Sequence, residues 1–362
     1  MRYQVFTNTP AHVHLYKHMV RGLQEQGHEV LVMGRDYGCT EALLDYYELP
    51  YEIYGKCETT KFSLFRELPK HYFNIAKHTR RFDPDVIFGY GAYAAHAGAL
   101  SRTPVVLVCD SEPTTLDHAI SKPFASAFLT PAAFGANLGP KHYRFNGFKE
   151  NAYLHPDVFE ARDDIRDLLG VGPDEKYAIL RLNAFGSHHD VGHAGFTPKR
   201  RRELIEQLSE HVTVLVSDEK GDMDFEGIDA REFDLHPALL HDALAEAHLL
   251  VADTQTMVTE AALLGTPAVR SNSFVGADDM GNFVELENHD LIYNIAEFDD
   301  ATAKALEIAR DDDVKAAWRA KRDEYVADKV NLTEVLLDVA THVDDLRGVQ
   351  TIERVDASGT GV

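Results

Sequence analysis

Short apolar stretches alternate with longer amphipathic ones along most of this chain. The short stretches are rich in β-branched and aromatic residues, which favour strands, and the longer ones repeat their apolar positions with the helical period. Such alternation is typical of βαβ units on parallel sheets. In the first half we predict strands at residues 3–7, 29–34, 51–54, 85–88, 105–109 and 127–129, and the clearest helices at 13–26 and 62–80.

The alternation breaks once, between about residues 146 and 174, where polar and turn-forming residues surround one short helical stretch. We therefore predict an α/β fold with two Rossmann-like domains, at residues 1–150 and 176–345, a linker at 151–175 and a flexible tail at 346–362. In the second half the predicted strands are 177–182, 212–217, 249–252, 268–271 and 291–295, and helices are predicted to begin near Pro198, Pro237, Thr256, Asp300 and Asp312.

Parallel α/β sheets bind their ligands outside the carboxyl ends of the strands. We therefore expect the two sheets to face each other across a cleft, with the chemistry in the loops that follow strands.

The composition is that of a folded globular protein, because 44% of the 362 residues are hydrophobic and 26% are charged. Acidic residues outnumber basic ones by 59 to 36, which gives a net charge of −23. Such a surface repels nucleic acid. We interpret it as adaptation to a salt-rich cytoplasm, which points to a halophilic, haloarchaeal source.

Three cysteines, Cys39, Cys57 and Cys109, occur in no metal-binding spacing and favour a reduced, cytoplasmic setting. The amino terminus lacks the pattern of a signal peptide. No apolar run approaches the roughly 18 residues that would span a bilayer, so we expect no transmembrane segment.

The segment TNTPAHVH follows the first predicted strand. Thr9 and Pro10 suit the start of a helix, so His12 has an ordinary structural explanation at a capped turn. An imidazole at the end of a strand can also act as a general base, because its unperturbed pKa of about 6.5 lies near physiological pH.

The strand at 177–182 leads into NAFGSHHDVGH, which holds three histidines and an aspartate within six positions. This pattern differs from the helical HExxH metal motif, so we predict no metal site here. The more favoured interpretation is a loop that contacts a phosphate or sugar, with Arg181 as an anion partner. The candidate residues are Arg181, Asn183, Ser187, His188 and His189.

The strongest candidate segment is residues 251–267, VADTQTMVTEAALLGTP, in which an apolar strand ends in Asp253 and a helix begins near Thr256. The free amides and the positive dipole end of such a helix suit a diphosphate. Glu260 would accept hydrogen bonds from a ribose. The alternative is an ordinary capped helix, because Thr256 and Glu260 have nearly the spacing of a capping box.

This segment is similar to the nucleotide-sugar signature of GT-B glycosyltransferases and of non-hydrolysing UDP-N-acetylglucosamine 2-epimerases. Together with the amino-terminal TNTPAHVHLYKHMVRGLQEQGHEVLVMGRD, YGAYAAHAGAL, CDSEP and LRLNAFGSHHDVG, it resembles DUF354, an archaeal and bacterial family of unassigned function. The resemblance covers about residues 1–345. It implies a GT-B-like fold with the donor nucleotide on the carboxyl-terminal domain.

The resemblance also implies roles for single residues. Thr254, Gln255, Thr256 and Met257 would contact the diphosphate, Glu260 the ribose, and the turn from Phe233 to His236 the base edge. His12 occupies the place of the histidine in a Gly-Gly-His turn of the N-acetylglucosaminyltransferase of peptidoglycan synthesis. This chain departs from the pattern at two places, where relatives carry glycines and it has Thr-Gln-Thr and Pro10-Ala11. The larger side chains there are expected to narrow the range of ligands that fit, or to change it.

Our first hypothesis is a metal-independent glycosyltransferase without a cofactor, in which His12 deprotonates the acceptor of a nucleotide-diphosphate sugar, such as a UDP-sugar. Its setting would be surface-glycan or lipid-linked glycan synthesis, with peripheral membrane contact left open.

A 2-epimerase is the alternative, with Asp110, Glu112 and His188 or His189 as acids and bases. The epimerase hypothesis is the weaker one, because the segment Gly89-Tyr90-Gly91-Ala92 has no acidic residue where epimerases carry an aspartate. A third reading is a nucleotide-sugar-binding protein without turnover. The sequence leaves open the donor base and sugar, the acceptor, retention or inversion, and the oligomeric state.

Overall fold

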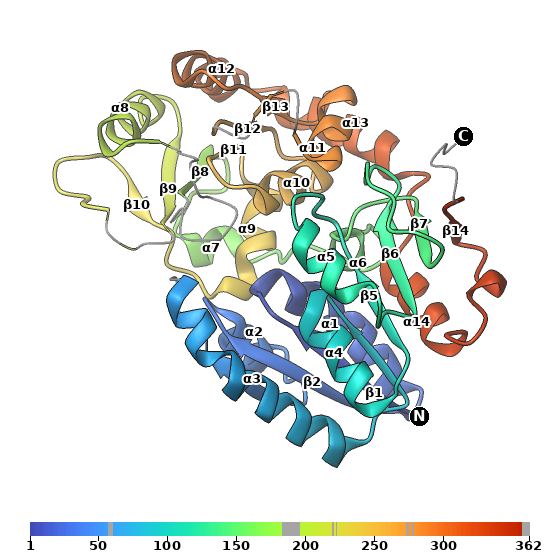
Figure 1. Cartoon of the computed structure of the whole chain (residues 1–362). Helices are drawn as coiled ribbons and strands as arrows, with labels where there is room; N and C mark the ends of the chain where they lie inside the picture. The colour runs from blue at the N-terminus through green and yellow to red at the C-terminus, as the bar shows by residue number, and fades with distance from the viewer. Residues whose placement is uncertain are drawn as a thin grey trace. The chain divides into compact units, whose positions relative to one another are not determined.

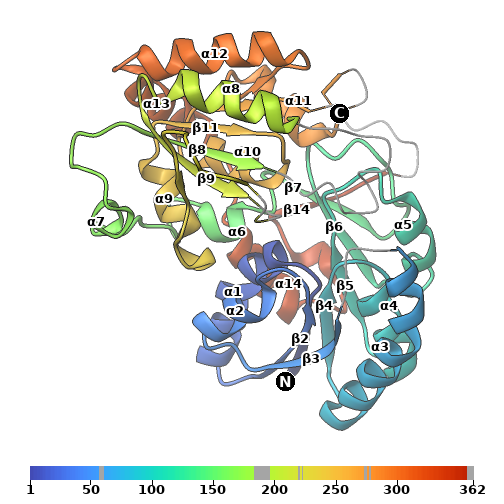
Figure 2. The same cartoon turned by 90° about the vertical axis from the view of Figure 1, so that its left-hand side faces the viewer.

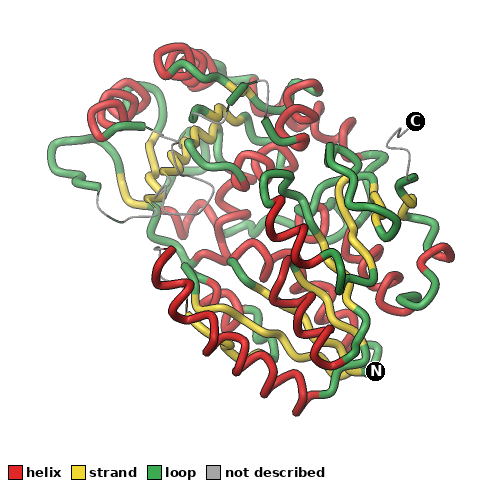
Figure 3. The backbone as a smooth tube through the Cα atoms, in the orientation of Figure 1, coloured by secondary structure: helices red, strands yellow, loops and turns green. Residues whose placement is uncertain are grey.

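The computed structural model describes residues 1–56, 61–182, 196–218, 221, 223–272, 275–276 and 279–356, without the side chains of residues 61–65. The chain forms two compact units (Figure 1). Unit 1 comprises Met1–Val158 and Asp328–Val362, and unit 2 comprises Phe159–Ala327. Helices flank strands in each unit (Figure 3), as the alternating sequence pattern predicts.

Unit 1 is built on an eight-stranded sheet with the order β14-β7-β6-β5-β4-β1-β2-β3. All neighbouring strands are parallel except β14 and β7, which are antiparallel. The strands are β1 (Arg2–Thr7), β2 (Glu29–Asp36), β3 (Tyr51–Lys56), β4 (Val86–Gly89), β5 (Val105–Val108), β6 (Ala127–Pro131), β7 (His142–Phe145) and β14 (Ile352–Arg354).

Helices cover both faces of this sheet. One face carries α3 (Lys61–Phe82), α4 (Gly91–Ser101) and α5 (Thr115–Ser121), which lie side by side (Figure 2). The opposite face carries α1 (Pro10–Glu25), α2 (Thr40–Tyr46), α6 (Asn151–Leu154) and α14 (Leu332–Thr341). Helix α4 packs closely because Gly98 faces Val105, where an added Cβ would lie 2.0 Å from a valine methyl carbon.

Unit 2 is built on a six-stranded parallel sheet with the order β10-β9-β8-β11-β12-β13. The strands are β8 (Tyr177–Leu182), β9 (Thr213–Asp218), β10 (Arg231–Glu232), β11 (Leu249–Ala252), β12 (Ala268–Arg270) and β13 (Tyr293–Asn294). The helices are α7 (Ile165–Leu169), α8 (Pro198–Leu208), α9 (Leu240–Glu246), α10 (Thr256–Leu263), α11 (Gly281–Asn288), α12 (Phe298–Arg310) and α13 (Val314–Val326).

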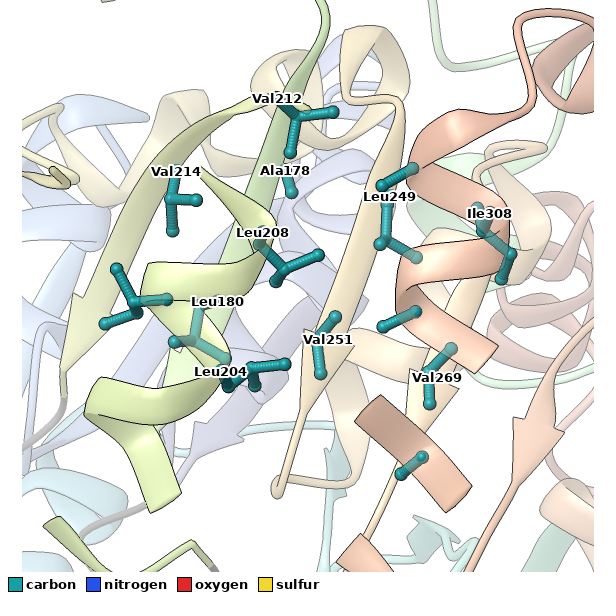
Figure 4. Close-up of a cluster of buried hydrophobic side chains, with 14 of the residues drawn as sticks. Ala178, Leu180, Leu204, Leu208, Val212, Val214, Leu249, Val251, Val269 and Ile308 are labelled. Atoms are coloured by element: carbon teal, nitrogen blue, oxygen red, sulfur yellow. The ribbon is translucent and has the colours of Figure 1, made fainter. Parts of the chain in front are cut away.

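The core of unit 2 lies between this sheet and helices α8 and α12 (Figure 4). Leu180 and Val251 project from the central strands and meet Leu204 of α8 and Ile308 of α12, and all four side chains are buried. This packing fixes β8 and β11, so the loops that follow them start from rigid positions.

The predicted α/β class with two parallel-sheet domains is confirmed. The predicted strands at 177–182 and 249–252 have the observed bounds, and those of the first half end within two residues of the observed positions. Local patterns suffice here because buried parallel strands are nearly continuous apolar runs.

The observed unit boundaries differ from the predicted ones at the carboxyl end. Residues 328–345 belong to unit 1, because α14 packs on α1 and α6 and the Val330 N–H donates to the Asn146 carbonyl at 2.9 Å. The predicted flexible tail includes β14, which pairs with β7. Residues 357–362 of that tail lie outside the described residues.

Candidate functional site

The carboxyl ends of β1, β4 and β5 are neighbours in the sheet of unit 1, so the loops that follow them converge. Helix α1 begins at Pro10 after Thr9, whose backbone is extended. The buried imidazole of His12 stacks on the ring of Tyr90, with centroids 5.1 Å apart and planes 26° apart. His12 from the first loop and Tyr90 from the second are thereby brought together.

The protonation state of His12 follows from its hydrogen bond. The backbone N–H of Asn8 donates to Nδ1 of His12 at 3.2 Å, so Nδ1 carries no hydrogen. The pKa of His12 is lowered to about 3, chiefly by burial and further by the positive charges of Lys149 and Arg35, while the Asp110 carboxylate partly opposes the shift. The ring is therefore neutral with its hydrogen on Nε2, and it presents a hydrogen-bond donor.

Asn8 holds this loop in place. Its Nδ2 donates to the carbonyl of Tyr90 at 3.0 Å, and its Oδ1 accepts from the hydroxyl of Tyr54 at 2.9 Å. The Nε of Arg35 donates to the Asn8 carbonyl at 2.9 Å. Asn8 was not among the predicted site residues, because its partners come from β2, β3 and the loop after β4.

Asp110 and Glu112 follow β5 and are both partly buried. Asp110 forms an ion pair with Lys149, whose Nζ also lies 3.5 Å from Glu150. The Gly135 N–H donates to Oε1 of Glu112 at 3.1 Å. His12 and Asp110 thus share one electrostatic environment with Lys149, a residue that the sequence analysis missed.

In unit 2, the chain turns sharply after β11. Asp253 is fully buried, and its carboxylate accepts from the Phe196 N–H at 3.1 Å while its carbonyl accepts from Nδ2 of Asn272 at 3.1 Å. Two neighbouring loops are tied in this way to the start of α10, so this turn is rigidly held.

The amino terminus of α10 has no side-chain cap, and its N-cap residue is Gln255. The capping box of Thr256 and Glu260 is therefore not formed. Thr254 is 7% exposed, and its hydroxyl has no hydrogen-bond partner within the described part of the chain. Uncapped amides beside a buried, unsatisfied hydroxyl are suited to an anion.

Glu260 lies one turn into α10 and pairs with His241 of α9. The His241 Nε2 and a Glu260 carboxylate oxygen are 3.0 Å apart, and both side chains are almost fully buried. Met257 is buried too. His241 was missed, because it lies 19 residues from Glu260 and on a different helix.

Of the remaining predicted residues, Arg181 and Phe233 both bond to β9, whereas His236 bonds within its own turn. Arg181, the next-to-last residue of β8, donates to the hydroxyl of Ser217 at 2.7 Å. The Phe233 N–H donates to the Val216 carbonyl at 2.8 Å, and Nδ1 of His236 accepts from the Ala238 N–H at 3.2 Å. Asn183, Ser187, His188 and His189 lie outside the described residues.

A surface pocket of about 560 Å³ is lined by Lys176, Thr213 and Arg231 among others. It lies at the amino ends of β8, β9 and β10, and thus at the opposite edge of the sheet from the candidate site. Over the described ranges, no group of three or more His, Cys, Asp or Glu is placed to hold a metal ion. No described helix is both long and apolar enough to cross a membrane.

A family model described as "Protein of unknown function (DUF354)" matches residues 3–329. An uncharacterized protein of Methanocaldococcus jannaschii is 24% identical over 280 residues, which are 73% of this chain and 79% of that protein.

Solved structures share the fold at low identity. The UDP-GlcNAc 2-epimerase of Neisseria meningitidis, bound to UDP-GlcNAc, is 9% identical with a TM-score of 0.62, over 94% of this chain and all of that one. The glycosyltransferase VinC in complex with dTDP is 14% identical with a TM-score of 0.58, over 96% of this chain and all of that one.

Proposed function

Given that the chain belongs to the DUF354 family, we propose that it is a metal-independent GT-B glycosyltransferase with a nucleoside diphosphate sugar as donor. The observation that carries this proposal is the start of α10, where uncapped amides adjoin the unsatisfied hydroxyl of Thr254. Structures that share this fold were solved with UDP-GlcNAc and with dTDP, which supports a nucleotide ligand.

Unit 2 would bind the donor. The backbone amides of residues 254–257 and the Thr254 hydroxyl would donate to the diphosphate, assisted by the positive end of the helix dipole. The Glu260 carboxylate, oriented by His241, would accept hydrogen bonds from the ribose hydroxyls. When the bond from the anomeric carbon to the diphosphate breaks, the same amides stabilise the charge on the leaving group.

Unit 1 would supply the remaining chemistry. In glycosyl transfer, the acceptor hydroxyl oxygen bonds to the anomeric carbon and gives up its proton. The sequence suggests His12 as the base, but the observed hydrogen bond at Nδ1 favours a donor role for its Nε2–H. His12 would thus hydrogen-bond an oxygen of the substrate, and the nearby Asp110 carboxylate is the candidate acceptor for the proton.

Thermal unfolding against a panel of nucleotides and nucleotide sugars tests the donor site. A ligand at 100 times its Kd stabilises the folded state by about 2.7 kcal/mol, so one nucleoside diphosphate and its sugars should raise the Tm. Glycosyl transfer is then tested with the identified donor and a series of acceptors. A folded protein whose Tm responds to no member of the panel would refute the proposal.

A 2-epimerase is the second candidate, because two carboxylates, Asp110 and Glu112, follow β5 in unit 1. A 2-epimerase breaks the bond between C2 of the sugar and its hydrogen. Incubation of the bound nucleotide sugar alone in deuterated water therefore distinguishes the two reactions, since only epimerisation introduces deuterium at C2. Binding with neither reaction would indicate a nucleotide-sugar-binding protein.

A further inference from the structure

The outer surface of helices α3, α4 and α5 is unusually apolar. We call the outward side chains of these helices and of the turn after α5 the α3–α5 face. Phe73 is 70% exposed, Leu116 is 74% exposed and Phe124 is 45% exposed, and Leu100 and Ile120 are also exposed. These five make up most of the large hydrophobic residues exposed in the described part of the chain.

Aromatic side chains connect the helices of this face. The three helices lie side by side over the sheet of unit 1 (Figure 2). The hydroxyl of Tyr72 on α3 lies 2.7 Å from Nδ1 of His96 on α4. The His96 ring in turn contacts the Phe124 ring, with centroids 5.3 Å apart. An aromatic strip therefore connects α3 to the turn after α5.

Basic residues on α3 lie beside this strip. On α3, the exposed residues Arg66, Lys70, Phe73, Lys77 and Arg80 follow one another at intervals of three or four, which places them on one side of the helix. Along its whole length this helix holds six basic residues and one acidic residue, in a chain with a net charge of −23. Lys70, Lys77 and Arg80 form no ion pair with any described residue.

We propose that the α3–α5 face docks on the surface of an anionic lipid bilayer. Exposed Phe and Leu side chains can enter the boundary between headgroups and acyl chains, and the Lys and Arg side chains of α3 can contact the lipid phosphates. The charge argues for this occupant, because a positive surface on an acidic protein is complementary to an anionic one. The inference goes beyond the proposed function and does not depend on it.

The first test is co-sedimentation of the full chain with vesicles. Vesicles of phosphatidylcholine and phosphatidylglycerol in equal parts should bind the protein, and vesicles of phosphatidylcholine alone should bind it weakly. Binding should fall as salt rises, over a range in which circular dichroism shows the protein folded. Equal binding to both vesicles, or binding to neither, would overturn the proposal.

Variants then test the face itself. The double variant Lys70→Ala/Lys77→Ala should bind anionic vesicles about thirtyfold more weakly, because each basic residue near such a bilayer contributes about fivefold. Phe73→Ser/Leu116→Ser should lose most of the binding at every salt concentration. The matched controls are Leu168→Ser, an exposed leucine on α7, and Lys199→Ala, an exposed lysine on α8, and both should bind like the wild type.

The same variants separate this proposal from the alternatives. Their thermal unfolding reports whether they fold, and their nucleotide binding reports on unit 2 independently of the vesicles. If Phe73→Ser/Leu116→Ser removes a dimer in analytical ultracentrifugation and leaves vesicle binding unchanged, the face binds a second copy of the chain and the proposal is wrong. Vesicle binding that persists in a protein without nucleotide affinity would refute only the proposed function.

Discussion

Replacing Thr254 with valine should stabilise the protein and weaken its nucleotide binding at the same time. The substitution exchanges a buried hydroxyl, which has no partner among the described residues, for a methyl group of similar shape. A buried polar group without a partner costs about 1–3 kcal/mol, and an apolar replacement of the same shape removes that cost. We expect the free energy of unfolding of the ligand-free protein to rise by about 1 kcal/mol.

The same hydroxyl is proposed to donate to the diphosphate. A hydrogen bond to a charged group contributes about 1.5–3 kcal/mol, which corresponds to a loss of about 10- to 100-fold in affinity. The measurement is urea unfolding of the wild type and Thr254→Val, together with calorimetric titration of the nucleoside diphosphate that gives the largest Tm shift. A variant that is less stable, or that binds this ligand as tightly as the wild type, would refute the reasoning.

Two threonines of unit 2 provide matched controls. Thr302 on α12 is also buried with no partner for its hydroxyl among the described residues, so Thr302→Val should bring a similar gain in stability and leave nucleotide affinity unchanged. The hydroxyl of Thr259 on α10 accepts from Nδ2 of Asn282 at 3.1 Å. Thr259→Val should therefore lower the free energy of unfolding by about 1 kcal/mol.

Further predictions concern His12 and Glu260. His12→Ala should lower turnover by about 10²- to 10³-fold without changing nucleotide affinity, and His12→Gln, which keeps a donor near the Nε2 position, should retain more turnover, as steady-state kinetics will report. If both variants were fully inactive, the result would instead support His12 as the general base. The lowered pKa of His12, about 3, means that the unfolded chain binds a proton below about pH 6.5 that the folded protein does not. The stability due to neutral His12 is thus present above about pH 6.5 and is lost as pH falls toward about 3, so urea unfolding of His12→Gln should show a shallower loss over this range. Glu260→Gln should weaken nucleotide binding at least tenfold, as measured by calorimetry, which is about the effect of losing one charge-assisted hydrogen bond. His241→Gln should weaken binding less, because His241 acts only through Glu260.

Most helices and strands could be predicted from the sequence, because each depends on a contiguous apolar pattern. The unit boundaries could not. The apolar residues of α14 are as consistent with one domain as with the other, and only their packing on α1 assigns them to unit 1. Likewise, β14 is a three-residue strand with one buried side chain, and its pairing with β7 is what defines it.

In the candidate site too, local features could be predicted from the sequence and contacts between distant residues could not. Residues 253–260 form one contiguous segment, so their pattern predicts a helix start that suits an anion. Lys149 was missed because it reaches Asp110 across 39 positions of sequence. Tyr90, which stacks on His12, lies between β4 and α4, and the sequence pattern there indicates only that an acid is absent. Contacts of this kind depend on the order of strands in the sheet, which a single sequence does not specify.

The protonation state of His12 illustrates why a residue type alone does not determine a role. An imidazole after a first strand suggests a base, because its unperturbed pKa is near physiological pH. Here a backbone N–H is directed at Nδ1, and burial removes the charged form, so the neutral ring presents a donor instead. The group that decides this role is the backbone N–H of Asn8. Every residue except proline has such a group, so the sequence does not indicate where one will bond to a side chain. Since α1 starts at Pro10, Asn8 lies before the helix and its N–H remains available for this bond. The chemistry of His12 therefore follows from where the helix begins.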